Sequence, residues 1–481
     1  MTLKKILQKI YKVSRNTHME VYVVGGFVRD SLLKKDYKKD IDFVVLGSGL
    51  EFARALDEEL KNEGSLIEFP DFDTARYVFV DREDNNKILL EVEFAGARRE
   101  KYDSTSRKPL VESTTLHEDL MRRDFTVNAM AQKVGRFGIS KKIIDDFEGK
   151  KDLKEKILRT PLDPDITFSE DPLRMLRAAR FSAQLEFSLE KETLEAIARN
   201  KERIRIVSQE RIQEELMKLL STRKPSVGLV ILYQTGILDE ILPEVSALSG
   251  VEEVAGYTHK DNFSHTLAVV DNIAESSENV LLRFAGLMHD IAKPETKKFS
   301  KSRGWTFDMH EHLGKKMVWE IGKRLRMKKQ DIHYVAELVR WHLQPIALMD
   351  KGVTDSAVRR LIVNLEDDLN DLLLLCRADV TTGNQKKREK RMKNYDYLEK
   401  RIEEVLEKDQ LRAFQSPLRG EEIMKLCNLK PGPTVGKIKE EIERAILDGD
   451  IPNEYESAVE YFEKIKEKYL QDIQSWEKEG K

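Results

Sequence analysis

The sequence predicts an α+β protein with a mixed head at its start and a helical chain from about residue 150 onward. Residues 20–147 contain four β-rich runs, VYVV, IDFVVLG, ARYVFV and ILLEVEFAG, separated by short helical stretches. After residue 150 strand patterns nearly vanish, and apolar residues recur at spacings of three and four. A chain of 481 residues is too long to fold around one hydrophobic core, and we expect it to have four parts. They are a head (1–147), a helical neck (148–248), a second helical domain (249–400) and a helical C-terminal segment (401–481).

The composition limits the cellular compartment and the partners that we expect for the protein. Charged residues make up 35% of the chain, and no apolar run approaches the roughly 18 residues of a membrane span. The basic N-terminal stretch has Leu3, Ile6, Leu7 and Ile10 at helical spacing but lacks the features of a signal peptide, so we expect a surface helix. The two cysteines form no metal or redox pattern, which fits a reducing cytoplasm. The net charge of -3 does not exclude a nucleic-acid partner, and nothing indicates a membrane or an obligate protein partner.

The first motif is a glycine turn close to two aspartates, in VYVVGGFVRD and DIDFVVLG. Gly25 and Gly26 allow close approach of backbone, and the helix that follows has N-terminal N–H groups suited to phosphate. On the second strand Asp40 and Asp42 share one face, since side chains alternate. Two such carboxylates repel each other unless a cation lies between them, and Mg²⁺ with a substrate phosphate meets that need. The alternative is a solvated strand end.

Two further pairs of charged residues need an interpretation, one pair in the head and one in the neck. A third acid for the metals could come from Glu91 or Glu93, which face the same side of their strand, and the sequence does not choose between them. Glu210 and Arg211 are expected to be a structural pair near the start of a helix, with no catalytic role.

A cationic stripe follows in EDPLRMLRAARF. Asp171, Arg174, Arg177 and Arg180 are spaced by three along a predicted helix and drift slowly around its axis. Such arginines either pair with carboxylates or meet an anion, and a triphosphate near the glycine turn favours the second interpretation.

Five sequence blocks together resemble the class II tRNA nucleotidyltransferase and poly(A) polymerase family, whose head has a polymerase-beta-like nucleotidyltransferase fold. The blocks are GGFVRD with DID, LHEDLMRRDFTVNAMA, IIDDFEGKKDL, EDPLRMLRAARF and SQERIQEEL, in the order that the family has them.

The resemblance implies a role for each matching residue. Gly26 and Arg29 would contact the triphosphate, and Asp40 and Asp42 would hold the metals. Arg123 and Asp124 would contact phosphate and sugar. Asp171 and Arg174 would read the base, and Arg177 and Arg180 would continue the helix toward the phosphates.

The implied reaction is attack of a terminal ribose hydroxyl on the α-phosphorus of CTP or ATP, at the 3′ end of a tRNA. The polar segment 99–119, with Arg107 and Pro109, resembles the flexible loop of CCA-adding enzymes. A poly(A) polymerase and an enzyme that adds only the last adenosine stay open. A different class, an RNA-end-binding protein whose hydrolase domain does the only chemistry, is disfavoured by the intact Asp40 and Asp42.

Cytosine and adenine share a hydrogen-bonding pattern that two side chains can select. Each base offers an amino donor beside a ring-nitrogen acceptor, whereas uracil and guanine offer a carbonyl beside a ring N–H. Asp171 as acceptor and Arg174 as donor match the first pattern and oppose the second.

Seven of the nine histidines fall between residues 259 and 342. This part of the chain resembles the HD superfamily of metal-dependent phosphohydrolases. The matching stretches are HTLAVVDN, LMHDIAKPETKKF, MHEHLG, RWHL and CRADVTT. The resemblance implies four metal ligands, His265, His289, Asp290 and Asp379, with His310, His342 and Lys293 at a second metal or a phosphate. Imidazole and carboxylate ligands suit Mn²⁺, Fe²⁺ or Ni²⁺. Ala292 replaces the glycine of many members, and a purely structural domain is the alternative.

The C-terminal stretch 417–453 predicts two helices around a Pro-Gly-Pro turn and resembles the tail of this family. Backbone at Thr434–Gly436 and the basic run KKREKRMK, residues 386–393, could contact RNA phosphates. A packing corner and a solvated helix face are the respective alternatives.

Overall fold

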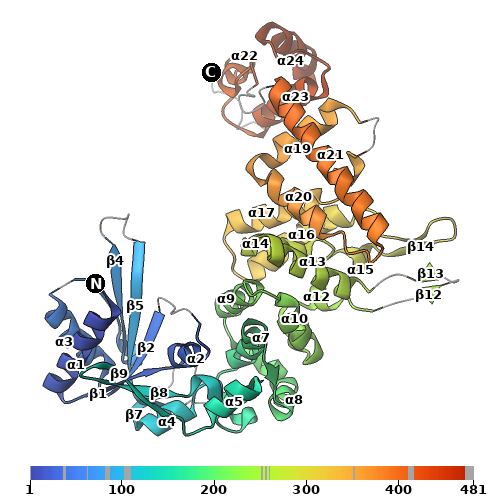
Figure 1. Ribbon diagram of the computed structural model, residues 1–481. Helices are drawn as coiled ribbons and strands as arrows, with labels where there is room; N and C mark the ends of the chain where they lie inside the picture. The colour runs from blue at the N-terminus through green and yellow to red at the C-terminus, as the bar shows by residue number, and fades with distance from the viewer. Residues whose placement is uncertain are drawn as a thin grey trace. The chain divides into compact units, whose positions relative to one another are not determined.

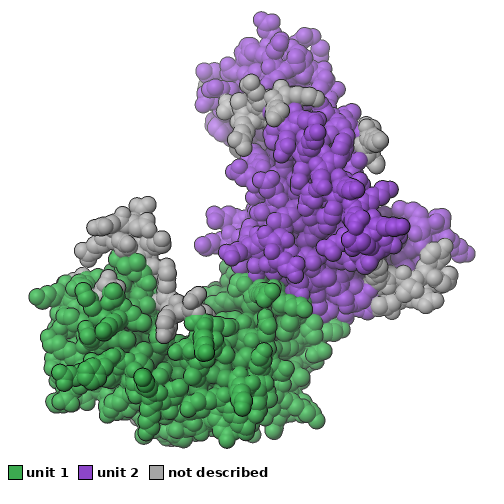
Figure 2. All heavy atoms as spheres, in the orientation of Figure 1, with its two compact units in different colours: residues 1–247, 324–327 green, residues 248–323, 328–481 purple. Residues whose placement is uncertain are grey.

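The computed structural model describes residues 2–35, 40–61, 63–81, 87–101, 110–250, 253–254, 257–258, 261–349, 353–409 and 416–471. The chain forms two compact units, residues 1–247 with 324–327 and residues 248–323 with 328–481 (Figure 2). The α+β prediction is confirmed, because one large sheet lies near the start of the chain and the rest is mainly helical. Among the described residues, no helix combines the length and apolar character needed to span a bilayer. The boundaries of the four predicted domains stay predictions.

The first half of unit 1 contains a seven-stranded sheet with the order β3-β4-β5-β2-β1-β8-β9. Its elements are α1 (Leu3–Thr17), β1 (Glu20–Val24), α2 (Gly26–Leu32), β2 (Asp40–Leu46), α3 (Gly49–Leu60), β3 (Ser65–Phe69), η1 (Pro70–Phe72), β4 (Thr74–Asp81), β5 (Lys87–Gly96), β6 (Arg98–Lys101), β7 (Leu110–Ser113), α4 (Leu116–Met121), η2 (Thr126–Asn128), β8 (Ala131–Gly135) and β9 (Gly138–Ile144). Strands β2 and β5 run parallel, and β1 pairs antiparallel with both β2 and β8. The four predicted β-rich runs all form strands of this sheet.

Helices α1 and α3 cover one face of the sheet, and α2 lies on the other (Figure 1). The core under α3 is aromatic: the Phe94 ring lies 5.0 Å from that of Phe43 and 5.2 Å from that of Phe52. Ile6, Leu7 and Ile10 are buried, so the apolar stripe of α1 packs on the head as the surface-helix prediction requires. On the opposite face of β2, Asp40 and Asp42 are exposed at the start of the strand and Val44 is buried further along it.

The second half of unit 1 is helical. It contains α5 (Gly149–Glu155), β10 (Ile157–Leu158), α6 (Pro164–Glu170), α7 (Leu173–Leu185), β11 (Ser188–Leu189), α8 (Lys191–Asn200), η3 (Lys201–Ile206), α9 (Gln209–Leu220), α10 (Pro225–Gln234), α11 (Ile237–Ile241) and α12 (Pro243–Ser246). Helix α7 packs against α9 and α10. Asp163 caps α6 by accepting hydrogen bonds from the backbone of Asp165 and Ile166, with Pro164 at the first helical position. This cap fixes the start of α6, the helix that precedes the arginine-bearing helix α7.

The described residues of unit 2 are mainly helical, with two small hairpins. It contains β12 (Glu253–Val254), β13 (Tyr257–Thr258), α13 (Asn262–Ser276), α14 (Val280–Met288), α15 (Lys293–Thr296), β14 (Lys298–Ser300), β15 (Gly304–Thr306), α16 (His310–Arg324), α17 (Lys329–Trp341), α18 (Gln344–Ala347), α19 (Asp355–Leu365), η4 (Glu366–Asp368), α20 (Leu369–Ala378), α21 (Gln385–Asp409), α22 (Gly420–Cys427), α23 (Pro433–Asp448) and α24 (Tyr455–Leu470). Helices α13, α14, α17 and α20 pack together. The predicted C-terminal helix pair is confirmed as α22 and α23, and Gly449 with φ of 80° ends α23.

Candidate active site and metal centre

The glycine turn after β1, at Gly25 and Gly26, lies close to Asp40 and Asp42 in unit 1. In the β1–β2 register Val24 lies opposite Asp42, so the turn that follows β1 lies beside the start of β2. Gly25 has φ of 70°, a conformation that favours glycine. A Cβ atom there would lie 3.2 Å from Nη1 of Arg123 and 3.5 Å from Oδ2 of Asp42. Any larger residue would crowd the charged groups of the site.

The strand alternation predicted from the sequence is confirmed at β2. Asp40 and Asp42 are exposed, and the residues between and after them are buried. Desolvation by the surrounding protein raises the pKa of Asp42; the Arg123 charge opposes this effect, and the charges of Glu93 and Asp40 add to it. A cation between the carboxylates would relieve that repulsion, and hard oxygen ligands of this kind fit Mg²⁺.

The neighbouring strand supplies further acids. In the parallel β2–β5 register Asp40 lies opposite Glu91, and Asp42 lies opposite Glu93. Arg76 on β4 contacts both glutamates, with N···O distances of 3.8 Å to Glu91 and 3.2 Å to Glu93. Glu93 lines the same depression as Asp42. The geometry therefore favours Glu93 as the third acid.

Two adjoining depressions in unit 1 contain the predicted nucleotide site. The larger, of about 520 Å³, contains the glycine turn, and the smaller, of about 330 Å³, contains Asp171. All ten head and neck residues predicted to bind metal or nucleotide line one or both of them: Gly26, Arg29, Asp40, Asp42, Arg123, Asp124, Asp171, Arg174, Arg177 and Arg180. The walls shared by the two depressions are Asp42, Arg123, Asp124 and Arg177.

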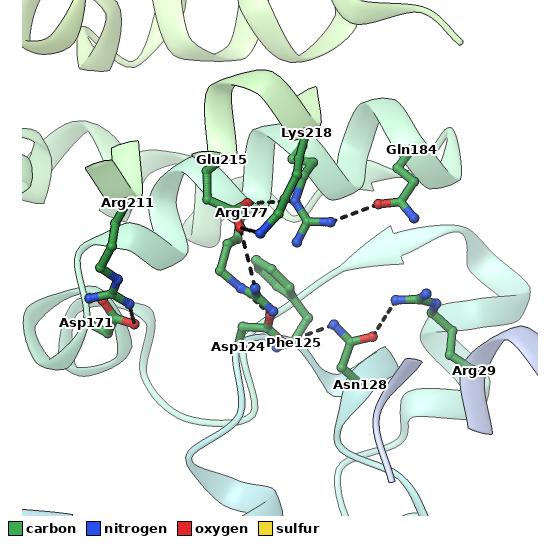
Figure 3. Close-up of polar contacts among 11 residues, drawn as sticks. Arg29, Asp124, Phe125, Asn128, Asp171, Arg177, Gln184, Arg211, Glu215 and Lys218 are labelled. Carbon is green, nitrogen blue, oxygen red and sulfur yellow. Dashed lines mark hydrogen bonds and ion pairs between the residues drawn. The ribbon is translucent and has the colours of Figure 1, made fainter. Parts of the chain in front are cut away.

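The arginines of α7 already have carboxylate partners (Figure 3). Arg177 donates to Oδ2 of Asp124 from Nε at 2.9 Å and from Nη2 at 2.6 Å. Arg180 donates from Nε to Glu215 at 2.7 Å. Arg174 is buried, donates to the Thr167 carbonyl at 3.3 Å and lies 3.5 Å from Glu170. The stripe thus has partners on α6, on α9 and in the loop between α4 and η2.

Asp124 is the centre of a buried network that joins α7 to α2 (Figure 3). Burial alone would raise its pKa, but the Arg177 charge and a hydrogen bond from Asn128 lower that pKa to about 2. Asn128 donates to Asp124 at 2.9 Å and accepts from Nη1 of Arg29 at 2.7 Å. Arg29 is itself buried, and its Nε donates to Asp30. Helices α2 and α7 are therefore tied to each other through Asp124 and Asn128.

Several residues of the site were not singled out from the sequence. Asn128 and Glu215 lie within two of the quoted blocks, so their position in the motifs was an available signal. Arg76 and Lys218 line the larger depression but lie in ordinary strand and helix patterns.

Arg211 does not pair with Glu210, so that expectation was wrong. Its Nη2 donates to Oδ2 of Asp171 at 3.2 Å, while Glu210 lies 4.0 Å from Arg326. Consecutive residues of a helix point in different directions and seldom meet each other. Arg211 instead lines the smaller depression.

Unit 2 brings the predicted HD residues together as two candidate metal-binding groups. His265, His289 and Asp379 form one group, and Asp290, His310 and His342 form the other. Asp290 lies between them, because its Oδ2 is 3.2 Å from Nε2 of His289 and its Oδ1 is 3.4 Å from Nε2 of His310. Lys293 donates to Asp290 at 2.5 Å.

Each of the four imidazoles is held through its Nδ1 atom. His289, His310 and His342 meet the carbonyls of residues 286, 307 and 339 at 2.7–2.8 Å. His265 meets the Thr381 hydroxyl at 2.7 Å. Contacts of this kind orient the ring and leave Nε2 to a metal. The Nε2 atom of His289 is buried and has no hydrogen-bond partner in suitable geometry among the described residues, although Oδ2 of Asp290 lies 3.2 Å away, which fits that role.

Charge coupling in this centre is strong. Burial opposes a charge on His289, yet Asp290 and Asp379 outweigh it and raise its pKa to about 10. Burial lowers the pKa of His342 to about 4, and the nearby His289 charge adds to this shift. Binding of a metal cation would replace the proton on His289. Ala292 is fully buried with a negative φ of -93°, so glycine is not required there.

Some predicted contacts lie elsewhere or outside the described residues. Arg107, Pro109 and His259 lie outside them. The run KKREKRMK forms the beginning of α21 and is largely exposed. In the first turn of α23, Thr434 is buried and Gly436 is exposed.

Comparison with known proteins agrees with this arrangement. Family models match the poly A polymerase head domain at residues 21–159, the probable RNA and SrmB-binding site of polymerase A at 186–248, and the HD domain at 262–384. An A-adding tRNA nucleotidyltransferase of Deinococcus radiodurans is 32% identical over 70% of this chain and 76% of its own length. A multifunctional CCA protein of Neisseria meningitidis is 35% identical over 68% of this chain and 73% of its own.

Solved structures show the same fold. A CCA-adding enzyme in complex with ATP aligns with a TM-score of 0.59 and 22% identity, over 96% of this chain and 95% of its own. A Thermotoga maritima CCA-adding enzyme complexed with tRNA aligns with a TM-score of 0.54 and 22% identity, over 98% and 95%.

Proposed function

The chain belongs to the class II tRNA nucleotidyltransferase and poly(A) polymerase family, and we propose that it adds C, C and A to the 3′ end of tRNA from CTP and ATP. The observation that carries the proposal is the pair of adjoining depressions in unit 1. They combine paired carboxylates, a glycine turn, several arginines and a base-reading pair. The 3′ hydroxyl of the RNA is the nucleophile, so no covalent protein intermediate is required.

The larger depression takes the triphosphate in this proposal. Asp40 and Asp42 hold Mg²⁺, and Glu93 is the third carboxylate. Bound Mg²⁺ would neutralise phosphate charge and lower the pKa of the attacking hydroxyl. Arg29, Arg180 and Lys218 line the same space and supply cations for the phosphate oxygens.

The smaller depression takes the base. Asp171 accepts from the amino group of cytosine or adenine, and Arg174 donates to the adjacent ring nitrogen. Arg174 is buried and tied to Thr167, which restricts its position. Uracil or guanine would set a carbonyl against the carboxylate, and sites built on hydrogen bonds can reject such mismatches by roughly 10⁴-fold.

Unit 2 adds a metal-dependent phosphohydrolase activity toward nucleotide or RNA-end phosphates. The two groups joined by Asp290 can hold a pair of metal ions, and their nitrogen-rich ligands suit Mn²⁺, Fe²⁺ or Ni²⁺. Metals there would act as Lewis acids toward a phosphate ester. Lys293 donates to Asp290, which joins the two groups, and in this proposal its ammonium group contacts the phosphate of the substrate.

The experiment uses three tRNA substrates, ending before the CCA triplet, after the first C and after CC. Each is incubated with the protein, Mg²⁺ and one labelled triphosphate at a time. The proposal expects C on the first two substrates and a single A on the third. Repeated addition of A to any RNA end would instead show a poly(A) polymerase.

A second candidate is addition of the final adenosine alone. One observation favours it: the Deinococcus radiodurans relative is named an A-adding tRNA nucleotidyltransferase. This candidate expects A on tRNA ending in CC and no C on either shorter substrate.

A further inference from the structure

Arg211 contacts the residue that the proposed function assigns to reading the base. It reaches from α9 to Oδ2 of Asp171 at 3.2 Å (Figure 3). Both side chains line the smaller depression. The other oxygen, Oδ1, accepts from the backbone N–H of Leu173 at 3.2 Å. Both carboxylate oxygens of Asp171 are therefore engaged before any nucleotide binds.

We propose that Arg211 is a specificity-determining residue whose effect depends on Asp171. Paired with Asp171, it fixes the carboxylate as an acceptor for the exocyclic amino group of cytosine or adenine. Released from Asp171, it becomes a donor at the same position and favours the carbonyl of uracil or guanine. This inference rests on the proposed function, because it places the base in the smaller depression.

The chemistry of the two groups permits both states. A carboxylate oxygen has more than one acceptor site, so Oδ2 can accept from Arg211 and from a base amino group together. A guanidinium has five donors and no acceptor, so a free Arg211 cannot bind an amino group. It can donate to a carbonyl in a charge-assisted hydrogen bond. The ion pair thus decides which kind of exocyclic group is accepted.

The neighbouring arginines are less able to take this position. Arg177 is bound to the buried Asp124, and Arg174 is buried with its Nη1 on a backbone carbonyl. Arg122 and Arg123 both contact the buried Asp119, at 3.3 and 3.2 Å. The side chain of Arg211, in contrast, is 54% exposed and its partner Asp171 is 24% exposed. Arg211 is therefore the arginine that we expect to move when its partner Asp171 is removed.

The test is a double-mutant cycle with Asp171→Ala, Arg211→Ala and both together. Asp171→Ser is a second variant for the case that the alanine variant folds poorly, because a serine hydroxyl can still accept from the Leu173 backbone N–H. Arg199→Ala is the matched control, since Arg199 is a neck arginine paired with Asp165 at 2.6 Å and 49% exposed. Affinities for CTP, ATP, UTP and GTP are measured by calorimetry with Mg²⁺ and without RNA. Single-nucleotide incorporation on a fixed tRNA end is measured in parallel.

Asp171→Ala is expected to shift relative affinity toward UTP and GTP by about 10- to 100-fold, the effect of one charge-assisted hydrogen bond. Arg211→Ala should weaken the affinity for CTP and ATP by about fivefold at most, because accessible ion pairs are weak. It should not increase the affinity for UTP or GTP. The double variant should lose the gain seen in Asp171→Ala, and Arg199→Ala should behave as wild type. A double variant that keeps the gain overturns the inference.

The binding measurement separates this inference from the proposed function. If the wild type transfers neither CMP nor AMP, the proposed function fails, while the four affinities still decide the role of Arg211. If the wild type binds all four triphosphates equally, the base is not read by Asp171, and the inference fails with that assignment.

Discussion

Asp124→Asn tests the buried network that holds the nucleotide site together. Asp124 is 7% exposed, and its Oδ1 accepts from the Phe125 backbone and from Asn128. Its Oδ2 accepts two hydrogen bonds from Arg177. Asparagine keeps the shape of the side chain but removes its charge. It also puts an amide N–H₂, which only donates, in place of a carboxylate oxygen that accepts hydrogen bonds. Arg177, whose side chain is 33% exposed, would then have Glu215, at 3.8 Å, as its nearest described carboxylate.

The expected loss is about 2–4 kcal/mol in the free energy of unfolding of the head, the range for breaking a buried charged hydrogen-bond pair. The pKa gives a similar figure. A carboxyl whose pKa falls from 3.8 in the unfolded chain to about 2 in the fold contributes roughly 2.5 kcal/mol. Because the folded pKa is the lower one, this contribution is fully present above about pH 4 and is lost as the pH falls toward 2.

The assay must separate the head from unit 2. All four tryptophans lie between residues 305 and 476, so tryptophan fluorescence in urea reports unit 2. Hydrogen exchange of peptides from β1, α4 and η2 at increasing urea reports the head. Asp165→Asn is the control, because Asp165 pairs with an exposed arginine and should cost less than about 1 kcal/mol. The reasoning is refuted if Asp124→Asn destabilises the head peptides no more than Asp165→Asn, or if the fluorescence transition moves equally.

Three further predictions concern activity. Replacing Asp40 or Asp42 with Ala should abolish nucleotide transfer and leave phosphohydrolase activity intact, measured on the same preparation, and near wild-type transfer would contradict the metal assignment. Glu93→Gln should lower the transfer rate by at least about tenfold and Glu91→Gln by less than about threefold, as expected if only one of them holds metal; equal effects would remove the distinction. Changing both His289 and Asp290 to Ala should remove bound metal and phosphate-ester hydrolysis without slowing transfer, measured by metal analysis and both activity assays. If the wild type hydrolyses no phosphate ester with any first-row metal, the domain is structural.

Local pattern was sufficient for the parts of the site that lie within one element. Alternation along DIDFVVLG placed Asp40 and Asp42 on one face, because a strand has a period of two. Motif order then identified residues on several elements that the fold brings around the two depressions. The histidine pattern likewise identified residues that the fold brings together, because they lie at or near the ends of helices that pack against one another.

The pairing of charges could not be predicted in this way. Arg177 and Asp124 are 53 residues apart, Arg29 and Asn128 are 99 apart, and Arg211 and Asp171 are 40 apart. Which carboxylate meets which arginine depends on how α7 packs against α9 and on where η2 lies, and neither follows from periodicity. The wrong pairing of Glu210 with Arg211 has this cause.

The arginines of α7 were expected either to pair with carboxylates or to meet an anion, and the geometry allows both. Arg177 uses Nε and Nη2 for Asp124, which occupies one edge of its guanidinium. A guanidinium has five donors in a planar fork, so its remaining donors can bind a phosphate oxygen while the first edge stays bound. The carboxylate then fixes the direction of those donors before the nucleotide enters. Less conformational entropy is lost on binding, which is the advantage of a preorganised site. Asp124 and Glu215 are therefore expected to position the arginines for the triphosphate rather than to compete with it.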